Sequence, residues 1–232
     1  MTTGPIGVRK MAGIEAHESK LYSEFAPFYD RVFGKIFYNR LERVIEDLDI
    51  PPGAQVLEVG AGTGTSFPAY PNHCHVTGVD LAPDMLARAR QKIEDNGWSH
   101  LKVMEMNALD LKFPDNTFDF VMAFHVVTVV PDPVRMIAEA KRVCKPSGKI
   151  AIVNHFTSDV PVLGSLTKAI DPLTRWLGWR TDLQLKPFIA ATGLTVERVY
   201  KTNKSSLYTV VLARKETNGR RSIRELYQNG AR

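Results

Sequence analysis

A glycine-rich segment in the first third of the chain combines residue types and spacing that suit ligand binding. Residues 56–64 read Val-Leu-Glu-Val-Gly-Ala-Gly-Thr-Gly, an apolar stretch that runs into Gly60, Gly62 and Gly64. Glycines in such a turn adopt left-handed backbone angles and let a ligand approach the backbone closely. Glu58 stands two residues before the first glycine. Its carboxylate would repel a pyrophosphate but would pair well with a cationic ligand.

A second acid follows at a spacing that suits a nucleoside. Asp80 ends the next apolar stretch, twenty residues after Gly60. A carboxylate at the end of a neighbouring strand can accept hydrogen bonds from ribose hydroxyls, in dinucleotides and in other adenosyl ligands. The alternative is that Glu58 and Asp80 are solvated acids at strand ends. A dinucleotide-dependent dehydrogenase would need a glycine at position 65, where Thr65 stands, so this class is disfavoured.

The elements that must position these residues alternate along the chain. Apolar stretches predict strands at 55–59, 75–79, 101–104, 118–124 and 149–154, and helical spacing predicts helices at 83–96 and 133–144. A further helix is expected directly after the glycine turn, with its first N–H groups towards the ligand. Residues 145–148, Lys-Pro-Ser-Gly, predict a break after the second helix. This order predicts an α/β fold with a parallel sheet and helices on both faces.

Three regions follow from the change of pattern along the chain. Residues 1–50 are expected to form a helical cap or lid, which stops at Pro51-Pro52-Gly53. Residues 51–214 form the main domain, whose second half adds predicted helices at 160–179 and 182–192 and a hairpin of strands at 194–200 and 206–213. Residues 215–232 form a basic tail.

Composition excludes several classes of protein. The chain has 232 residues, 44% hydrophobic and 24% charged, which is typical of a globular domain. Its two cysteines, Cys74 and Cys144, exclude a disulfide scaffold and a four-cysteine zinc site, and no histidine spacing suits a metal. No apolar stretch approaches the length of a membrane span, and residues 1–12 lack the apolar core of a signal peptide. We therefore expect a cytoplasmic protein without a bound metal.

Taken together, the motifs resemble those of class I S-adenosylmethionine (SAM) methyltransferases. The glycine segment with Glu58 is followed by Val-Asp-Leu-Ala-Pro-Asp-Met-Leu at 79–86, and then by Asn107-Ala108 and matching turns at 113–119 and 143–149. These matches cover about residues 54–155. The resemblance implies a Rossmann-like sheet of order 3-2-1-4-5-7-6 with strand 7 antiparallel. It also implies SAM as methyl donor and S-adenosylhomocysteine as product.

The resemblance also implies a role for each matched residue. Glu58 would meet the α-amino group of SAM, and Asp80 the ribose hydroxyls. Asn107 departs from the aspartate common in the family, so a contact with the adenine amine depends on its side-chain oxygen. The other implied contacts are the backbone of Gly60, Ala61, Gly62 and Gly64 with the methionine part, Leu81 and Met85 with the adenine, Ala108 at the adenine edge, and Phe124 and His125 below the methyl group.

Two further segments narrow the range of candidate methyl acceptors. Residues 21–35, Leu-Tyr-Ser-Glu-Phe-Ala-Pro-Phe-Tyr-Asp-Arg-Val-Phe-Gly-Lys, and residues 125–133, His-Val-Val-Thr-Val-Val-Pro-Asp-Pro, resemble bacterial phospholipid N-methyltransferases. That group makes phosphatidylcholine from phosphatidylethanolamine. The pattern of Tyr22, Tyr29 and Asp30 is shared with quinone-ring C-methyltransferases, so a quinone-type or small-molecule methyltransferase remains the alternative.

Three residues are candidates for catalysis on an amine. The amine must lose a proton before it attacks a methyl group, and a histidine of ordinary pKa, His125, suits a weak base. Tyr22 and Tyr29 could orient the amine, and with Phe25 their rings could hold a methylated ammonium. The alternative for each aromatic residue is core packing, and for His125 a hydrogen-bonded role in the pocket wall.

The expected partners are a phospholipid substrate and an anionic membrane surface, contacted peripherally. Residues 14–37 and 160–179 combine apolar, aromatic and basic side chains as helices at a membrane interface do, although each stripe would equally suit packing within the protein. Residues 198–232 carry a net charge of +7, and Lys35, Arg175 and Arg180 are candidates for the lipid phosphate. Few aromatic residues accompany the basic ones, so no nucleic acid is expected. A non-catalytic lipid- or RNA-binding module and any oligomeric state stay open.

Overall fold

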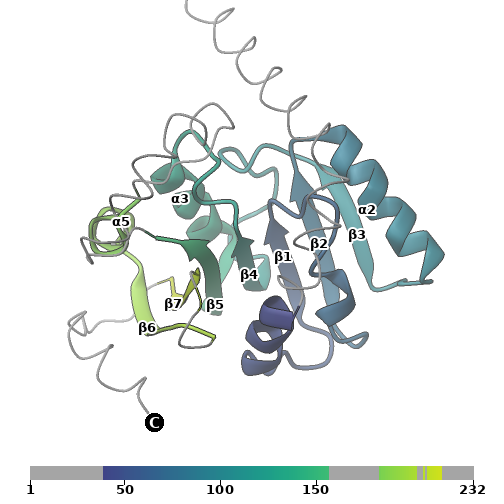
Figure 1. The fold of residues 1–232 in the computed structure, drawn as a ribbon, viewed down its shortest axis with the longest axis horizontal. Coiled ribbons are helices and arrows are strands. Elements are labelled where there is room, and N and C mark those ends of the chain that lie inside the picture. Colours follow the sequence, from purple (N-terminus) through teal and green to yellow (C-terminus); the bar gives the residue numbers. More distant parts are fainter. Residues whose placement is uncertain (1–38, 157–182, 203–205, 207, 216–232) are drawn as a thin grey trace, which may run out of the picture.

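The computed structural model describes residues 39–156, 183–202, 206 and 208–215, which contain a single seven-stranded sheet. Its strand order is β3-β2-β1-β4-β5-β7-β6, and β7 runs antiparallel to both of its neighbours (Figure 1). The predicted order and the antiparallel strand are thus confirmed. The strands are β1 (Gln55–Val59), β2 (His75–Asp80), β3 (Leu101–Glu105), β4 (Phe118–Phe124), β5 (Cys144–His155), β6 (Thr195–Tyr200) and β7 (Tyr208–Arg214).

The helices begin and end where local chemistry favours it. Helices α2 (Pro83–Asp95) and α3 (Pro133–Val143) both carry a proline in the first turn, where no N–H partner is needed. Asp132 caps α3 by accepting a hydrogen bond from the Arg135 N–H at 2.9 Å. Helix α5 (Leu185–Thr192) ends at Gly193 in the left-handed conformation. Residues 39–47 are also helical.

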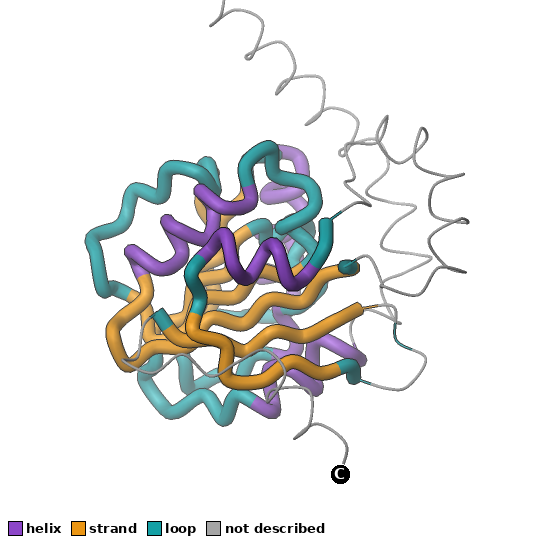
Figure 2. Tube along the Cα trace, turned by 90° about the vertical axis from the view of Figure 1, so that its left-hand side faces the viewer, coloured by secondary structure: helices purple, strands orange, loops and turns teal. Residues whose placement is uncertain are grey.

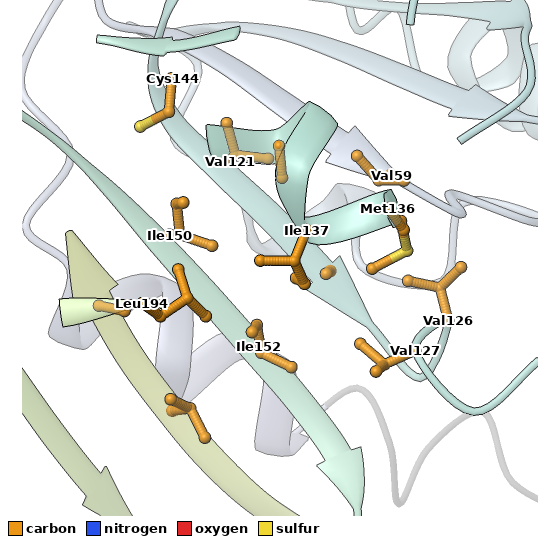
Figure 3. Packing of buried hydrophobic residues seen from close by; sticks show 14 of the residues in the cluster. Val59, Val121, Val126, Val127, Met136, Ile137, Cys144, Ile150, Ile152 and Leu194 are labelled. Atoms are coloured by element: carbon orange, nitrogen blue, oxygen red, sulfur yellow. The ribbon is translucent and has the colours of Figure 1, made fainter. Parts of the chain in front are cut away.

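Two apolar clusters hold helices against opposite faces of the sheet. Helices α3 and α5 pack on one face, where Met136 and Ile137 meet Val121, Ile150 and Ile152 (Figure 3). The helix at 39–47 and helix α2 pack on the other, against residues such as Phe120, Met122 and Val153. Neighbouring residues of β4 therefore alternate between the two clusters, as the pleat requires. Figure 2 shows helices on both sides of the strands.

The predicted break at residues 145–148 does not turn the chain away from the sheet. Cys144 already pairs with Phe118, and β5 continues to His155 with a register shift opposite Phe118 and Phe120. Gly148 makes this close pairing possible, since a Cβ there would lie 2.7 Å from the Cys144 Sγ and 2.8 Å from the Asp119 carbonyl oxygen. The segment ends α3 as expected, but it does so as extended chain.

The prediction of a helix directly after the glycine turn is wrong. Turns follow Gly64, and the only helical residues between β1 and β2 are the three of a 3-10 helix, η1 (Phe67–Ala69). Pro68 lies in this short helix and Pro71 follows it, and β2 begins at His75. Because Pro71 cannot donate the N–H that a continuing helix needs, the helical turn at Phe67–Ala69 does not extend into an α-helix.

Several predictions fall on residues 1–38, 157–182, 203–205, 207 and 216–232, which lie outside the described residues. They include the N-terminal cap, the helix at 160–179 and the basic tail beyond Lys215. Other predicted bounds differ from the observed ones by only a few residues, as for α5, which begins at Leu185. Among the described helices, none combines the length and apolar character that crossing a bilayer requires.

Candidate active site

The glycine loop lies at the carboxyl end of β1 and is pressed against the chain that leaves β4. Gly60 and Ala61 donate their N–H groups to the Val79 carbonyl oxygen at 2.8 and 3.0 Å, which fixes the loop to β2. Gly60 has a φ of +75°, and a Cβ there would lie 2.5 Å from Val126 Cγ2. Only glycine meets both conditions, so Gly60 allows the loop to pack closely against the chain that follows β4.

Glu58 is not the solvated acid of the alternative interpretation. Its side chain lies on β1 beneath the glycine loop and is 2% exposed. Both carboxylate oxygens accept the Ser66 hydroxyl at 2.7 Å, and one also accepts the Tyr70 hydroxyl at 2.6 Å. Burial raises the pKa of Glu58 to about 7, although these two hydrogen bonds oppose the shift, and the charge of Asp80 adds to it. Neither Ser66 nor Tyr70 was singled out from the sequence.

This environment predicts a pH-dependent stability. Between its ordinary pKa of 4.5 and about 7, Glu58 binds more proton in the folded chain than in the unfolded chain, so its contribution is full below 4.5 and is lost as pH rises. From pH 5.5 to 8.5 the loss should amount to about 2 kcal/mol in the free energy of unfolding. Urea denaturation of the wild type and Glu58→Gln at both pH values measures it. Equal pH dependence in the two proteins would contradict this assignment.

Asp80, at the end of β2, joins the glycine loop to the start of α2. Its two carboxylate oxygens accept the N–H groups of Gly62 at 2.8 Å and Ala82 at 2.9 Å. Burial raises the pKa of Asp80, and these backbone hydrogen bonds oppose the rise. A carboxylate has about four acceptor positions, so the two backbone donors leave others for a ligand. Asp80 is therefore a fixed acceptor beside the loop and not a freely solvated acid.

Apolar side chains and one amide border Asp80. Leu81 is 45% exposed and Met104, on β3, is 40% exposed, and both are unusual for large apolar side chains in this domain. Met85 is half-buried, and its sulfur lies 3.5 Å from where a Gly62 Cβ would be. Asn107 turns its side-chain oxygen back to accept the Leu109 N–H at 2.8 Å. That oxygen keeps one acceptor position for the predicted adenine contact.

The end of β4 carries the residues expected beneath the methyl group. Phe124 is buried, and His125 donates its backbone N–H to the Val153 carbonyl oxygen at 2.7 Å. His125 has a φ of +58°, a left-handed conformation that costs a non-glycine residue about 1–2 kcal/mol. The strand alternation ends there, and the imidazole meets the Tyr208 ring edge-on with centroids 4.5 Å apart. Strained backbone of this kind clusters at functional sites.

The pKa of His125 is not the ordinary one that supported its role as a base. Burial, and to a smaller extent the charge of Arg40, lower it to about 4. The imidazole is therefore neutral at pH 7. The Arg40 guanidinium lies over the ring of Tyr208 with its carbon 5.4 Å from the ring centroid. Sequence reasoning overlooked Tyr208 and Arg40, while Tyr22, Tyr29, Lys35, Arg175 and Arg180 lie outside the described residues.

Comparisons with known proteins agree with this geometry. A family model described as a methyltransferase domain matches residues 57–152. A phosphatidylethanolamine N-methyltransferase of Cereibacter sphaeroides is 39% identical over 192 residues, which cover 82% of this chain and 94% of the relative. The chain belongs to the class I SAM-dependent methyltransferases. Among its relatives is also a demethylmenaquinone methyltransferase of Listeria welshimeri, 28% identical over 150 residues, 61% of this methyltransferase and 64% of the relative.

Solved structures show the same fold. A SAM-dependent methyltransferase from Aquifex aeolicus matches with a TM-score of 0.63 at 22% identity, over 83% of this chain and 97% of that one. The YcgJ protein from Bacillus subtilis matches with a TM-score of 0.64 at 24% identity, over 71% and 72% of the two chains. The Rossmann-like architecture predicted from the motifs is thus confirmed.

The residues of this methyltransferase fit SAM. The loop at 60–64 has three glycines, the buried Glu58 can counter a cationic amino group, and the anchored Asp80 would hold the ribose hydroxyls. Leu81, Met85, Asn107 and Ala108 would surround the adenine. Among the described residues, no group of three or more His, Cys, Asp or Glu side chains is arranged to hold a metal ion.

Proposed function

We propose that this methyltransferase transfers methyl groups from SAM to the amine of phosphatidylethanolamine and its methylated forms, which yields phosphatidylcholine at a membrane surface. The observation that carries the proposal is the identity of 39% with a phosphatidylethanolamine N-methyltransferase, whose length this chain covers to 94%. The match to the demethylmenaquinone methyltransferase is weaker in identity and covers 64% of that relative. The weaker match supports the shared methyl-transfer chemistry, but it supports a quinone acceptor less than the stronger match supports a phospholipid acceptor.

The chemistry that bound SAM supplies is an electrophilic methyl group on a sulfonium. The part of the protein is to bind the acceptor amine in its neutral form and to aim its lone pair. A base with a pKa of about 4 takes a proton from an ammonium poorly, so His125 is better suited to accept a hydrogen bond from a neutral amine. The buried surroundings of His125 favour a neutral amine for the same reason that they favour the neutral imidazole.

The proposed surface is an anionic bilayer, which the protein contacts peripherally. The support is the sequence pattern of residues 14–37, with apolar and aromatic side chains between basic ones, and the charge of +7 in residues 198–232. Each basic residue close to such a surface contributes about 1 kcal/mol, a contribution that salt screens. Tyr22 and Tyr29 remain proposed contacts of the amine.

The acceptor is tested directly by a product analysis. Purified protein with labelled SAM is offered liposomes of phosphatidylethanolamine, of its mono- and dimethyl forms, and of a demethylated quinone. We expect label in the methylated phosphatidylethanolamines and in phosphatidylcholine, read by mass, and none in the quinone. Label in the quinone with none in the lipids would favour the C-methyltransferase, and no label in any product would favour a binding module.

A further inference from the structure

Four side chains from distant parts of the chain meet beside the carboxyl ends of β4 and β5. His125 and His155 both contact the ring of Tyr208 edge-on, with centroids 4.5 and 6.4 Å away. Tyr208 begins β7 directly opposite His155 in the sheet. Arg40, in the helix at 39–47, lies over the same tyrosine ring at 5.4 Å. Tyr208 therefore lies at the centre of a cluster that also contains both histidines and one permanent cation.

The position of this cluster relates it to methyl transfer. Val126, the residue after His125, is the one that a Gly60 Cβ would strike. The cluster therefore begins one residue before Val126, which contacts the glycine loop after the end of β4. Arg40 and Tyr208 extend it from there towards β7, away from Asp80 and β2 in the sheet order. The cluster is therefore adjacent in sequence to the residue that contacts the glycine loop.

The cluster has the electrostatic character of an anion site. Burial and the charge of Arg40 both lower the pKa of His125, so that imidazole is neutral at pH 7. Burial raises the pKa of Tyr208 in spite of Arg40, so its hydroxyl also stays neutral. Within the described part of the chain, the ion pairs of the protein do not include Arg40. An arginine with neutral hydrogen-bonding neighbours suits a phosphate, which it can bind with two parallel hydrogen bonds.

We propose that Arg40, together with Tyr208 and His155, binds the phosphodiester of the acceptor and so selects a zwitterionic phospholipid headgroup. In an ethanolamine phosphodiester one oxygen and two carbons separate the phosphorus from the amine. Because the rings of Tyr208 and His125 are only 4.5 Å apart between centroids, a phosphate held at Arg40 and Tyr208 would place the amine near His125. This inference rests on the proposed function, because it assigns Arg40 to the phosphodiester of the proposed phospholipid substrate. Phosphate recognition was assigned from the sequence to other basic residues.

The test compares Arg40→Gln and Arg40→Lys with the wild type in mixed micelles of detergent and phosphatidylethanolamine. A hydrogen bond to a charged group typically contributes enough to change affinity about 10- to 100-fold. Arg40→Gln should therefore raise the KM for phosphatidylethanolamine by about that factor, while the KM for SAM changes less than twofold. Arg40→Lys keeps the charge but not the forked geometry of the guanidinium. Its KM for phosphatidylethanolamine should therefore lie between those of the wild type and Arg40→Gln. Arg43→Gln is the matched control, since Arg43 is exposed on the same helix.

A binding measurement separates the headgroup from free phosphate. The histidine ring resonances of the wild type are followed by NMR during titration with sn-glycero-3-phosphoethanolamine and, separately, with inorganic phosphate. We expect the resonances of His125 and His155 to shift with the first ligand in the wild type and Arg43→Gln, and not in Arg40→Gln. Equal shifts with inorganic phosphate at the same concentration would overturn the selection of a headgroup.

Two outcomes distinguish a failure of this inference from a failure of the proposed function. A wild type that methylates phosphatidylethanolamine, with an unchanged KM in Arg40→Gln, overturns the phosphate site and leaves the proposed function intact. A wild type that forms no methylated phospholipid overturns both. If Arg40→Gln and Arg40→Lys raise the KM values for lipid and SAM equally, Arg40 has a structural role and the phosphate site is again overturned.

Discussion

Replacing Gly60 with alanine should abolish tight SAM binding, with at least a 100-fold loss of affinity. The added Cβ would lie 2.5 Å from Val126 Cγ2 and 2.6 Å from Val126 Cβ, and the φ of +75° is unfavourable for alanine. Left-handed backbone costs about 1–2 kcal/mol and overpacking about 1–3 kcal/mol, so the free energy of unfolding should also fall by about 2–5 kcal/mol. Isothermal titration with S-adenosylhomocysteine and urea denaturation measure the two effects.

Gly53 provides the matched control for this substitution. It has the same φ of +75°, but a Cβ there would meet nothing within 4 Å. Gly53→Ala should therefore lose only the backbone contribution to stability, about 1–2 kcal/mol, and should bind S-adenosylhomocysteine as the wild type does. Equal binding defects in the two variants would show that contact with Val126 does not position the loop.

Replacing Asp80 with asparagine should weaken SAM binding about 30- to 1000-fold. Asp80 accepts the N–H groups of both Gly62 and Ala82, and an amide nitrogen must face one of these donors in the variant. The loop then loses an anchor at the point where the ribose hydroxyls lose a charged acceptor, and hydrogen bonds to charged groups contribute about 1.5–3 kcal/mol each. Titration with S-adenosylhomocysteine gives the affinity, and kinetics on lipid micelles give the KM for SAM.

The control for Asp80 is Asp84, an exposed acid in the first turn of α2. Asp84→Asn makes the same chemical change four residues further along. It should cost only the helix-dipole contribution, about 0.3–1 kcal/mol of stability, and leave SAM affinity within twofold. Wild-type affinity in Asp80→Asn would remove Asp80 from the cofactor site.

The sequence predicts those parts of the site whose residues lie close together in one sequence motif. Gly60, Gly62 and Asp80 belong to one strand-turn-strand unit, and alternation of short apolar stretches with helical ones places that unit in a parallel sheet. The antiparallel β7 followed from the family resemblance together with a predicted hairpin. The segment at 145–148 ends α3 as predicted, but the fifth strand was predicted to begin at 149 and begins at Cys144, because Gly148 allows the close pairing that keeps the segment extended.

The residues that sequence reasoning missed act through tertiary contacts. Arg40 and Tyr208 are 168 positions apart and meet because the helix at 39–47 packs under β7. Ser66 and Tyr70 are close to Glu58 in sequence, but no motif shows that a turn and η1 will fold both hydroxyls onto its carboxylate. The pKa of His125 similarly depends on burial that a residue type does not reveal.

Strand β7 separates the proposed headgroup site from the basic residue that follows the strand. The strand begins with Tyr208 in the proposed headgroup site and ends with Arg214 at the opposite edge of the sheet. There Lys215 donates to the Asn116 side chain at 2.6 Å and to the Cys144 carbonyl oxygen at 3.3 Å. Seven residues of strand span about 20 Å, so Lys215, the last described residue, lies well away from Tyr208. On the proposed function, the charge of residues 198–232 would govern how long the enzyme stays on one vesicle, and so whether successive methylations finish before it leaves, while Arg40 would govern which headgroup is accepted.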